Sequence, residues 1–230
     1  MSRKAPVRKP IPVKSHRGAL PPLTPAQQAV VDAARQLPQF TDPLDVEVAL
    51  SAAVAPAREE DVWPGVVANA VAVPSRRSLA LLRAVTVLVP GVEAGVEADK
   101  LGDQGEPAWR EAIDRLVVGE CWVVDLRAEE GHQTLLCTYS YGDDVHAGLY
   151  LVDDNLGGVV KNAFITKDVA TARTMLDAYG AVEEIAADEA HRRLAEAYGK
   201  VDGGPGLGID PDVYVVELLV ARRIRLAQRS

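Results

Sequence analysis

The chain has 230 residues, of which 48% are hydrophobic and 25% charged, a composition typical of globular proteins rather than disordered ones. Two cysteines are too few for the disulfide framework of a small secreted domain, and no apolar run reaches the ~18 residues that a membrane span needs. The net charge is −8, but residues 1–24 hold six Lys/Arg and no acidic residue. The rest of the chain therefore contains 19 of the 25 basic residues and all 33 acidic residues. We expect this acidic part to repel nucleic acids. We therefore expect a soluble cytoplasmic protein that makes no membrane contact.

Residues 1–22 differ in composition from the rest of the chain. They combine six Lys/Arg with five prolines and few apolar side chains, so they cannot bury enough surface to offset the entropy of ordering. No apolar stretch follows the basic residues, which argues against a secretory signal. We expect a disordered basic arm, and we expect any nucleic-acid contact to be weak, non-specific and carried by this arm.

Residues 23–100 carry helix signals and predict a helical subdomain. The sequence Thr24-Pro25-Ala26-Gln27 is a capping box, and Asp42-Pro43 repeats the start signal. A run that is apolar nearly all round predicts a buried central helix, which Pro90 ends. The helices that we expect span residues 24–37, 42–56, 58–73 and 78–89.

Residues 91–106 are rich in Gly, Glu and Asp and have no sustained periodicity, so they predict a linker or surface loop. A short helix should follow between Pro107 and Gly119. We take the linker as the boundary between the helical subdomain and an α+β subdomain at 101–230. The alternative is that these two parts share one core and form one continuous domain.

The pattern then changes to strands. Three β-branched and aromatic runs at 121–126, 135–141 and 145–152 are separated by short polar turns and predict a three-stranded antiparallel meander. Such a sheet needs a covering layer, which helices at 168–179, 188–198 and 210–228 can supply. A glycine-rich loop, Gly203–Gly208, should precede the last helix. The fold class predicted is α+β, an N-terminal helical subdomain followed by a three-stranded antiparallel sheet covered by helices.

The segment after the third strand is the most distinctive in the chain. Carboxylate and amide oxygens could hold a hard cation such as Mg²⁺, and a glycine pair near a lysine could admit a phosphate. The alternative is a polar strand-to-helix corner, in which the acids bond to backbone amides and the glycines take positive φ. The candidate ligand-binding residues are Asp153, Asp154, Asn155, Gly157, Gly158 and Lys161.

The stretch from His132 through Phe164, above all Leu136–Gly142 and Val152–Lys161, resembles segments of actinobacterial proteins with no assigned activity. It covers about a seventh of the chain. The resemblance implies a bacterial cytoplasmic origin, and it carries over no catalytic residue.

Metal binding by Cys121, Cys137, His132 and His146 is an alternative, because hairpin pairing could bring strand residues together. The sequence has neither Cys-x-x-Cys nor His-x-x-x-His spacing, and the two histidines lie at turns. We expect the cysteines to stay reduced and to bind no metal, and Cys137 to be a small core side chain.

Three further clusters have plain structural interpretations. Cys137, Thr138 and Ser140 lie near the histidines in sequence, but no nucleophile elbow accompanies them. An exposed aromatic platform is one alternative for the tyrosines of the meander, and stabilising cross-strand pairs are the favoured one. The arginines of the last helix suit its C-terminal end, where cations complement the helix dipole. The tyrosines are Tyr139, Tyr141 and Tyr150, and the arginines are Arg222, Arg223, Arg225 and Arg229.

No recognisable nucleophile, metal or cofactor constellation emerges from the sequence. The function we predict is a binding or interaction module without catalytic activity or cofactor, with a protein partner or small ligand that the sequence does not identify. The alternative is a metal-assisted hydrolase or small-ligand enzyme centred on Asp153, Asp154, Asn155 and Lys161. Convergence of these four side chains in a concave pocket would favour the enzyme, and divergence the binding module.

Overall fold

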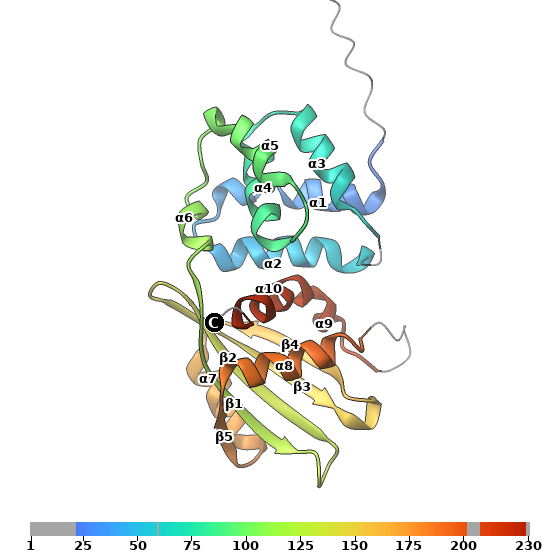
Figure 1. Ribbon diagram of the computed structural model, residues 1–230, viewed down its shortest axis with the longest axis vertical. Helices are drawn as coiled ribbons and strands as arrows, with labels where there is room; N and C mark the ends of the chain where they lie inside the picture. The colour runs from blue at the N-terminus through green and yellow to red at the C-terminus, as the bar shows by residue number, and fades with distance from the viewer. Residues whose placement is uncertain (1–21, 59, 202–207, 229–230) are drawn as a thin grey trace, which may run out of the picture.

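The computed structural model describes residues 22–58, 60–201 and 208–228. Helices occupy the N-terminal half, and a sheet with its covering helices forms the rest (Figure 1). The predicted arm at 1–22 lies almost wholly outside the described residues, as do most of the Gly203–Gly208 loop and Arg229. The N-terminal helices are α1 (Pro25–Ala33), η1 (Leu37–Gln39), α2 (Pro43–Val54), η2 (Ala55–Ala57), α3 (Trp63–Ala72), α4 (Arg76–Leu88), α5 (Ala94–Lys100), η3 (Gly102–Gln104) and α6 (Arg110–Ile113).

Local sequence signals set several of these helix starts. Thr24 forms the predicted capping box with Gln27, and the Asp42 side chain accepts a hydrogen bond from the amide of Leu44. The central helix α4 is buried along most of its length and packs against the other helices, as expected. The linker predicted at 91–106 is wrong in part: α5 forms there because Ala94 and Ala98 are small enough to be buried in the helical core.

The α+β class is confirmed, but the sheet has five strands rather than three. Its strands are β1 (Leu116–Leu126), β2 (His132–Tyr141), β3 (Asp144–Asp153), β4 (Val159–Thr166) and β5 (Val182–Ile185), in the order β4-β3-β2-β1-β5, with every neighbouring pair antiparallel. The prediction missed β4 because the glycine pair before it suggested a turn into a helix. It missed β5 because four residues at a sheet edge give little periodicity.

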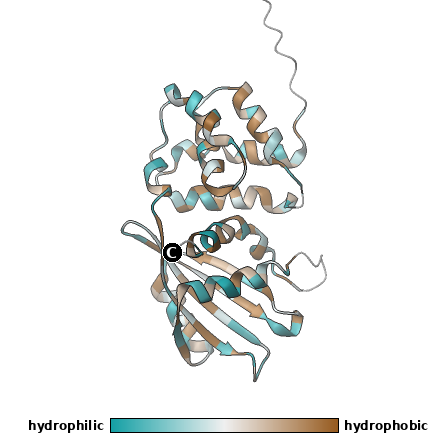
Figure 2. Ribbon diagram, in the orientation of Figure 1, coloured by the Kyte–Doolittle hydropathy of each residue, from teal (hydrophilic) through white to brown (hydrophobic). Residues whose placement is uncertain are grey.

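Helices cover both faces of the sheet (Figure 1). On one face lie α8 (Ala187–Tyr198), α9 (Pro211–Val215) and α10 (Glu217–Ala227), and on the other lies α7 (Val169–Tyr179). The last predicted helix is thus divided in two near Val216. Figure 2 shows apolar and polar residues mixed along these helices, as expected where one side of each packs on a core.

A buried charge cluster joins the two halves of the molecule. Glu47 on α2 accepts hydrogen bonds from Arg222 at 2.6 Å and Arg223 at 2.9 Å, both on α10, and none of the three side chains is more than 6% exposed. Arg222 also donates to the carbonyl of Ile113 and to Tyr141. The interpretation of these two arginines as helix-end cations that serve capping and solubility is therefore wrong, because their partner Glu47 lies 175 and 176 residues away in the sequence.

Candidate functional site

The acidic segment ends β3 and turns through a 3₁₀ helix, η4 (Asp154–Leu156), directly into β4. The strand-to-helix corner predicted here is therefore wrong, but the local bonding that we expected is present. Asp153 accepts a hydrogen bond from the Asn155 amide at 3.0 Å, and Gly157 and Gly158 have φ of 90° and 78°. The glycines thus provide the positive φ that lets the chain reverse into β4.

Asp153 and Lys161 form a salt bridge between two of the candidate side chains. Their side chains meet at 3.0 Å, with the carboxylate nearly buried and the ammonium partly exposed. Burial opposes ionisation of Asp153, but the hydrogen bond and charge of Lys161 and the Asn155 amide outweigh it and lower the pKa of the carboxyl. The acid is therefore held as a carboxylate with its partner already in place.

The other candidate side chains point elsewhere. Asn155 donates to the carbonyl of Glu130 at 2.9 Å and lies against Gly131, where a Cβ would come within 2.4 Å of it. Asp154 lines a depression on the α8 side of the sheet, together with Gly158. The four residues of the predicted hydrolase site therefore do not converge on one pocket.

The structure places a cavity of about 630 Å³ beside α7, on the sheet face that this helix only partly covers. Its apolar lining comes from Leu149 and Leu151 on β3, Phe164 on β4, and Met175 and Tyr179 on α7. Met175 and Tyr179 are 39% and 50% exposed, so the wall that α7 provides is open to solvent. An apolar ligand surface could be buried here against both strands and helix.

Polar side chains line the rest of this cavity. His132 and Thr134 come from β2, Lys161 and Asn162 from β4, and Asp210 from the N-cap of α9. Asn162 donates to Asp210 at 3.2 Å, which holds the start of α9 against β4. The cavity thus combines an apolar floor with hydrogen-bonding groups from three separate elements. We call it the sheet cavity.

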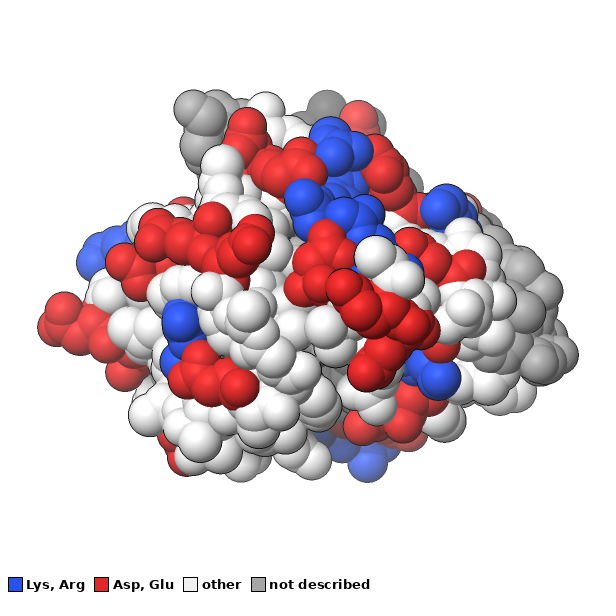
Figure 3. Space-filling view, turned by 90° about the horizontal axis from the view of Figure 1, so that it is seen from below, with Lys and Arg blue, Asp and Glu red and all other residues white. Residues whose placement is uncertain are grey.

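The depression that Asp154 lines is smaller, about 390 Å³, and much more polar. Arg193 on α8 bonds Glu189 at 2.7 Å and Gln133 at 3.0 Å, while Arg127 bonds Asp125. Figure 3 shows this end of the molecule, where basic side chains are surrounded by acidic ones. Because these charges are largely paired internally, the depression offers an incoming ion little free charge.

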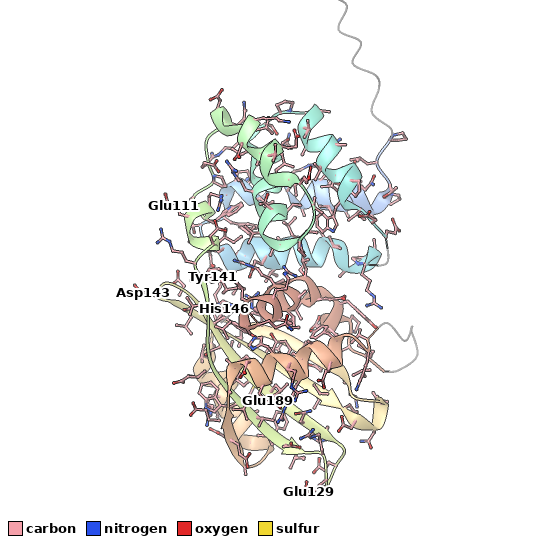
Figure 4. The ribbon with its side chains drawn as sticks, in the orientation of Figure 1. Glu111, Glu129, Tyr141, Asp143, His146 and Glu189 are labelled. Carbon is pink, nitrogen blue, oxygen red and sulfur yellow. The ribbon has the colours of Figure 1, made fainter. Side chains whose placement is uncertain are left out.

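The histidines considered as metal ligands lie away from the cysteines. His132 lines the sheet cavity, 3.7 Å from Glu130. His146 lies beside Tyr141 at the junction of the two halves and contacts Arg223 at 2.8 Å (Figure 4). Burial first, and then the nearby Arg223 charge, lower the pKa of His146 to about 3, so it is neutral at physiological pH.

Cys121 and Cys137 are both buried and directly paired across β1 and β2. The hydrogen bond with Cys137, aided by His191 and opposed by burial, lowers the pKa of Cys121 to about 6, and the pKa of Cys137 is raised by that same bond and by burial. Sequence reasoning missed His191, which lies on α8 far from either cysteine in the chain. A histidine in an amphipathic helix gives no sequence signal that separates a ligand from a core residue.

The remaining candidates are structural. Thr138 donates to the carbonyl of Glu120, and it lies with Ser140 on the sheet face opposite His146, so neither forms a nucleophile–base pair with that histidine. Tyr139, Tyr141 and Tyr150 are at most 5% exposed and belong to the core, as the favoured interpretation predicted.

Comparison of the chain with protein-family models, with curated proteins and with solved structures gave no match. The resemblance to actinobacterial proteins stays a prediction. Within the described part of the chain, none of the helices has both the length and the apolar character needed to cross a bilayer.

Proposed function

We propose that the protein is a binding module whose small organic ligand occupies the sheet cavity. The observation that supports this most is the cavity's lining, in which strands and α7 provide an apolar floor and wall while β2, β4 and α9 provide polar groups. Small-molecule sites in proteins usually have this combination of an apolar surface and a few placed polar groups.

The geometry gives less support to the metal-assisted hydrolase. A hard cation needs several oxygen ligands directed at one point. Asp153 is paired with Lys161, Asn155 is bonded to the Glu130 carbonyl, and Asp154 faces the other side of the sheet. Gathering these groups around one ion would require breaking two existing interactions and moving one side chain across the sheet.

Charge around the cavity favours one class of ligand. Lys161 is neutralised by Asp153, whereas Asp210 and Asp212 add negative charge on the α9 side. The lining therefore has more acidic than basic character and should attract a cationic or neutral hydrogen-bond donor more than an anion. We propose an amine with an aromatic or aliphatic body as the ligand class.

The test is a set of arylalkyl amines paired with arylalkyl carboxylates of the same size, followed by calorimetry and by thermal unfolding. Amines should bind and raise the midpoint of unfolding, and the matched carboxylates should bind at least tenfold more weakly. Met175→Trp should abolish amine binding, because the larger side chain fills the cavity from its exposed wall. Ala178→Trp is the matched control, since Ala178 is exposed on the same helix and does not line the cavity. Amine binding that survives Met175→Trp, or equal binding of both ligand series, would contradict the proposal.

A further inference from the structure

Three potential metal ligands meet in the core on the α8 side of the sheet, away from the sheet cavity. The Sγ atoms of Cys121 and Cys137 and a ring nitrogen of His191 all lie within 4.8 Å of one another. They come from β1, β2 and α8, and all three residues are at most 1% exposed. We call this group the Cys–Cys–His cluster.

Hydrogen bonding fixes the orientation of His191. Its Nδ1 lies 2.6 Å from the carbonyl oxygen of Ala187, which can only accept, so Nδ1 carries the proton. The lone pair of the neutral ring is then on Nε2, which lies 3.0 Å from the hydroxyl of Tyr139. A bond from the non-ligating nitrogen to a backbone carbonyl is the arrangement that metal-binding histidines usually adopt.

A buried hydroxyl without a hydrogen-bond partner lies at the same place. Tyr150 is fully buried, and among the described residues its Oη has no such partner. It leans over Gly148, which pairs with Cys137, and a Cβ at that glycine would come within 2.1 Å of the hydroxyl. Leaving this hydroxyl buried and unpaired is costly, so a polar or ionic partner would be stabilised beside the cluster.

We propose that the Cys–Cys–His cluster is a structural zinc site. Two thiolates and one imidazole are ligands that zinc prefers, whereas magnesium and calcium take oxygen ligands. Two thiolates also neutralise Zn²⁺, so the ion can be buried without leaving net charge in the core. This departs from our expectation of no metal, which rested on the spacing of the cysteines in the sequence.

The geometry requires only a small contraction. In a tetrahedral site with Zn–S of ~2.3 Å and Zn–N of ~2.0 Å, ligand atoms are about 3.3–3.8 Å apart. The present separations of at most 4.8 Å can reach that range by side-chain rotation. The Tyr139 hydroxyl, which lies 3.0 Å from Nε2 and is hydrogen-bonded to it, is the nearest protein group for the fourth position and would give up this bond when an ion binds.

The site would tie α8 to the sheet. β1 and β2 are already paired, so the only new connection is through His191 to the helix that covers this face. The three ligands and Tyr139 are at most 1% exposed, so the site is closed to solvent, as structural zinc sites usually are.

The test starts with the unmodified chain. It is treated with chelator, titrated with Co²⁺ and then with Zn²⁺. We expect one equivalent of Co²⁺ to give thiolate-to-cobalt charge-transfer absorption, which one equivalent of Zn²⁺ removes, and zinc should raise the midpoint of thermal unfolding. The chain is kept reduced throughout, and absence of the charge-transfer band, or an unfolding midpoint that zinc does not change, would overturn the proposal.

Variants locate the site. Cys121→Ser and His191→Gln should lose both the cobalt band and the zinc-dependent rise in midpoint. His132→Gln is the matched control, because it makes the same change at a histidine outside the cluster, and it should keep both. Zinc binding that persists unchanged in Cys121→Ser would show that the ion binds elsewhere. If a variant does not fold, the cobalt spectrum of the unmodified chain still decides the question.

Discussion

Replacing Glu47 by glutamine tests how the two halves of the molecule are held together. The carboxylate is the shared acceptor of Arg222 and Arg223, and it is completely buried. The substitution keeps the shape of the side chain but removes its charge, so two buried guanidinium groups lose their counter-ion. Hydrogen bonds to charged groups contribute about 1.5–3 kcal/mol each, and breaking a buried ion pair from one side costs about 3–5 kcal/mol. We expect the free energy of unfolding to fall by about 3–5 kcal/mol.

The assay is urea unfolding followed by circular dichroism, with the slope of the transition checked for two-state behaviour. Glu111→Gln is the matched control, because Glu111 is 88% exposed and pairs with Arg115 at 3.3 Å on the surface (Figure 4). An exposed pair of this kind contributes about 0.5 kcal/mol or less. If Glu47→Gln costs no more than Glu111→Gln, the buried cluster does not stabilise the junction and the reasoning fails.

The same carboxylate predicts a pH dependence. Burial raises the pKa of Glu47, but the charges of Arg223 and Arg222 and the hydrogen bonds from Tyr141 and Arg222 outweigh it and lower the pKa below the ordinary value of 4.5. A lowered pKa in the folded state means that the stabilisation is present above the unfolded value and is lost as pH falls through the folded one. Stability should therefore decrease below about pH 4.5, and Glu47→Gln should remove this part of the decrease.

Three further predictions concern His146, Gly158 and Asp153. The pKa of His146 is lowered to about 3, so between pH 6.5 and about 3 the unfolded chain binds a proton that the folded chain does not. Stability should therefore fall by about 1.4 kcal/mol per pH unit across this range. His146→Gln should flatten this slope, and an unchanged slope would refute the assignment. Gly158→Val should destabilise the protein by about 1–3 kcal/mol in urea unfolding, because φ is 78° there, and a cost below 0.5 kcal/mol, about the size of an ordinary surface change, would show that no strain arises. Asp153→Asn should cost less than about 1 kcal/mol, since its partner Lys161 is 42% exposed, and a loss as large as that of Glu47→Gln would contradict this.

Most of the local structure could be predicted from the sequence, but few of the long-range contacts could. The capping box at Thr24 and the β-branched and aromatic runs of β2 and β3 are local patterns, and the corresponding elements formed where they were expected. β4 was missed because its strand pattern directly follows a glycine pair. In the sequence, a glycine pair at the end of one strand looks the same whether a helix or another strand follows. The edge strand β5 is held by its pairing with β1, which no local pattern indicates.

The sites were harder to predict for the same reason. Asp153 and Lys161 are close in sequence and do form a pair, whereas the sheet cavity is assembled from β2, β3, β4, α7 and α9. Glu47 and Arg222 are 175 residues apart, and an arginine near the end of a helix has the same sequence pattern whether it is exposed or buried. Each of these arrangements depends on tertiary packing rather than on spacing along the chain.

Intermolecular nuclear Overhauser effects between a bound arylalkyl amine and the methyl groups of the chain would test the binding proposal most directly. The proposed ligand lies on the floor of the sheet cavity, within reach of Leu149, Leu151 and Met175. We predict contacts from the ligand's aromatic protons to the methyls of these three residues, and none to Val117, an exposed valine on β1 that does not line the cavity. Contacts to methyls elsewhere, with none to Leu149, Leu151 or Met175, would contradict the account.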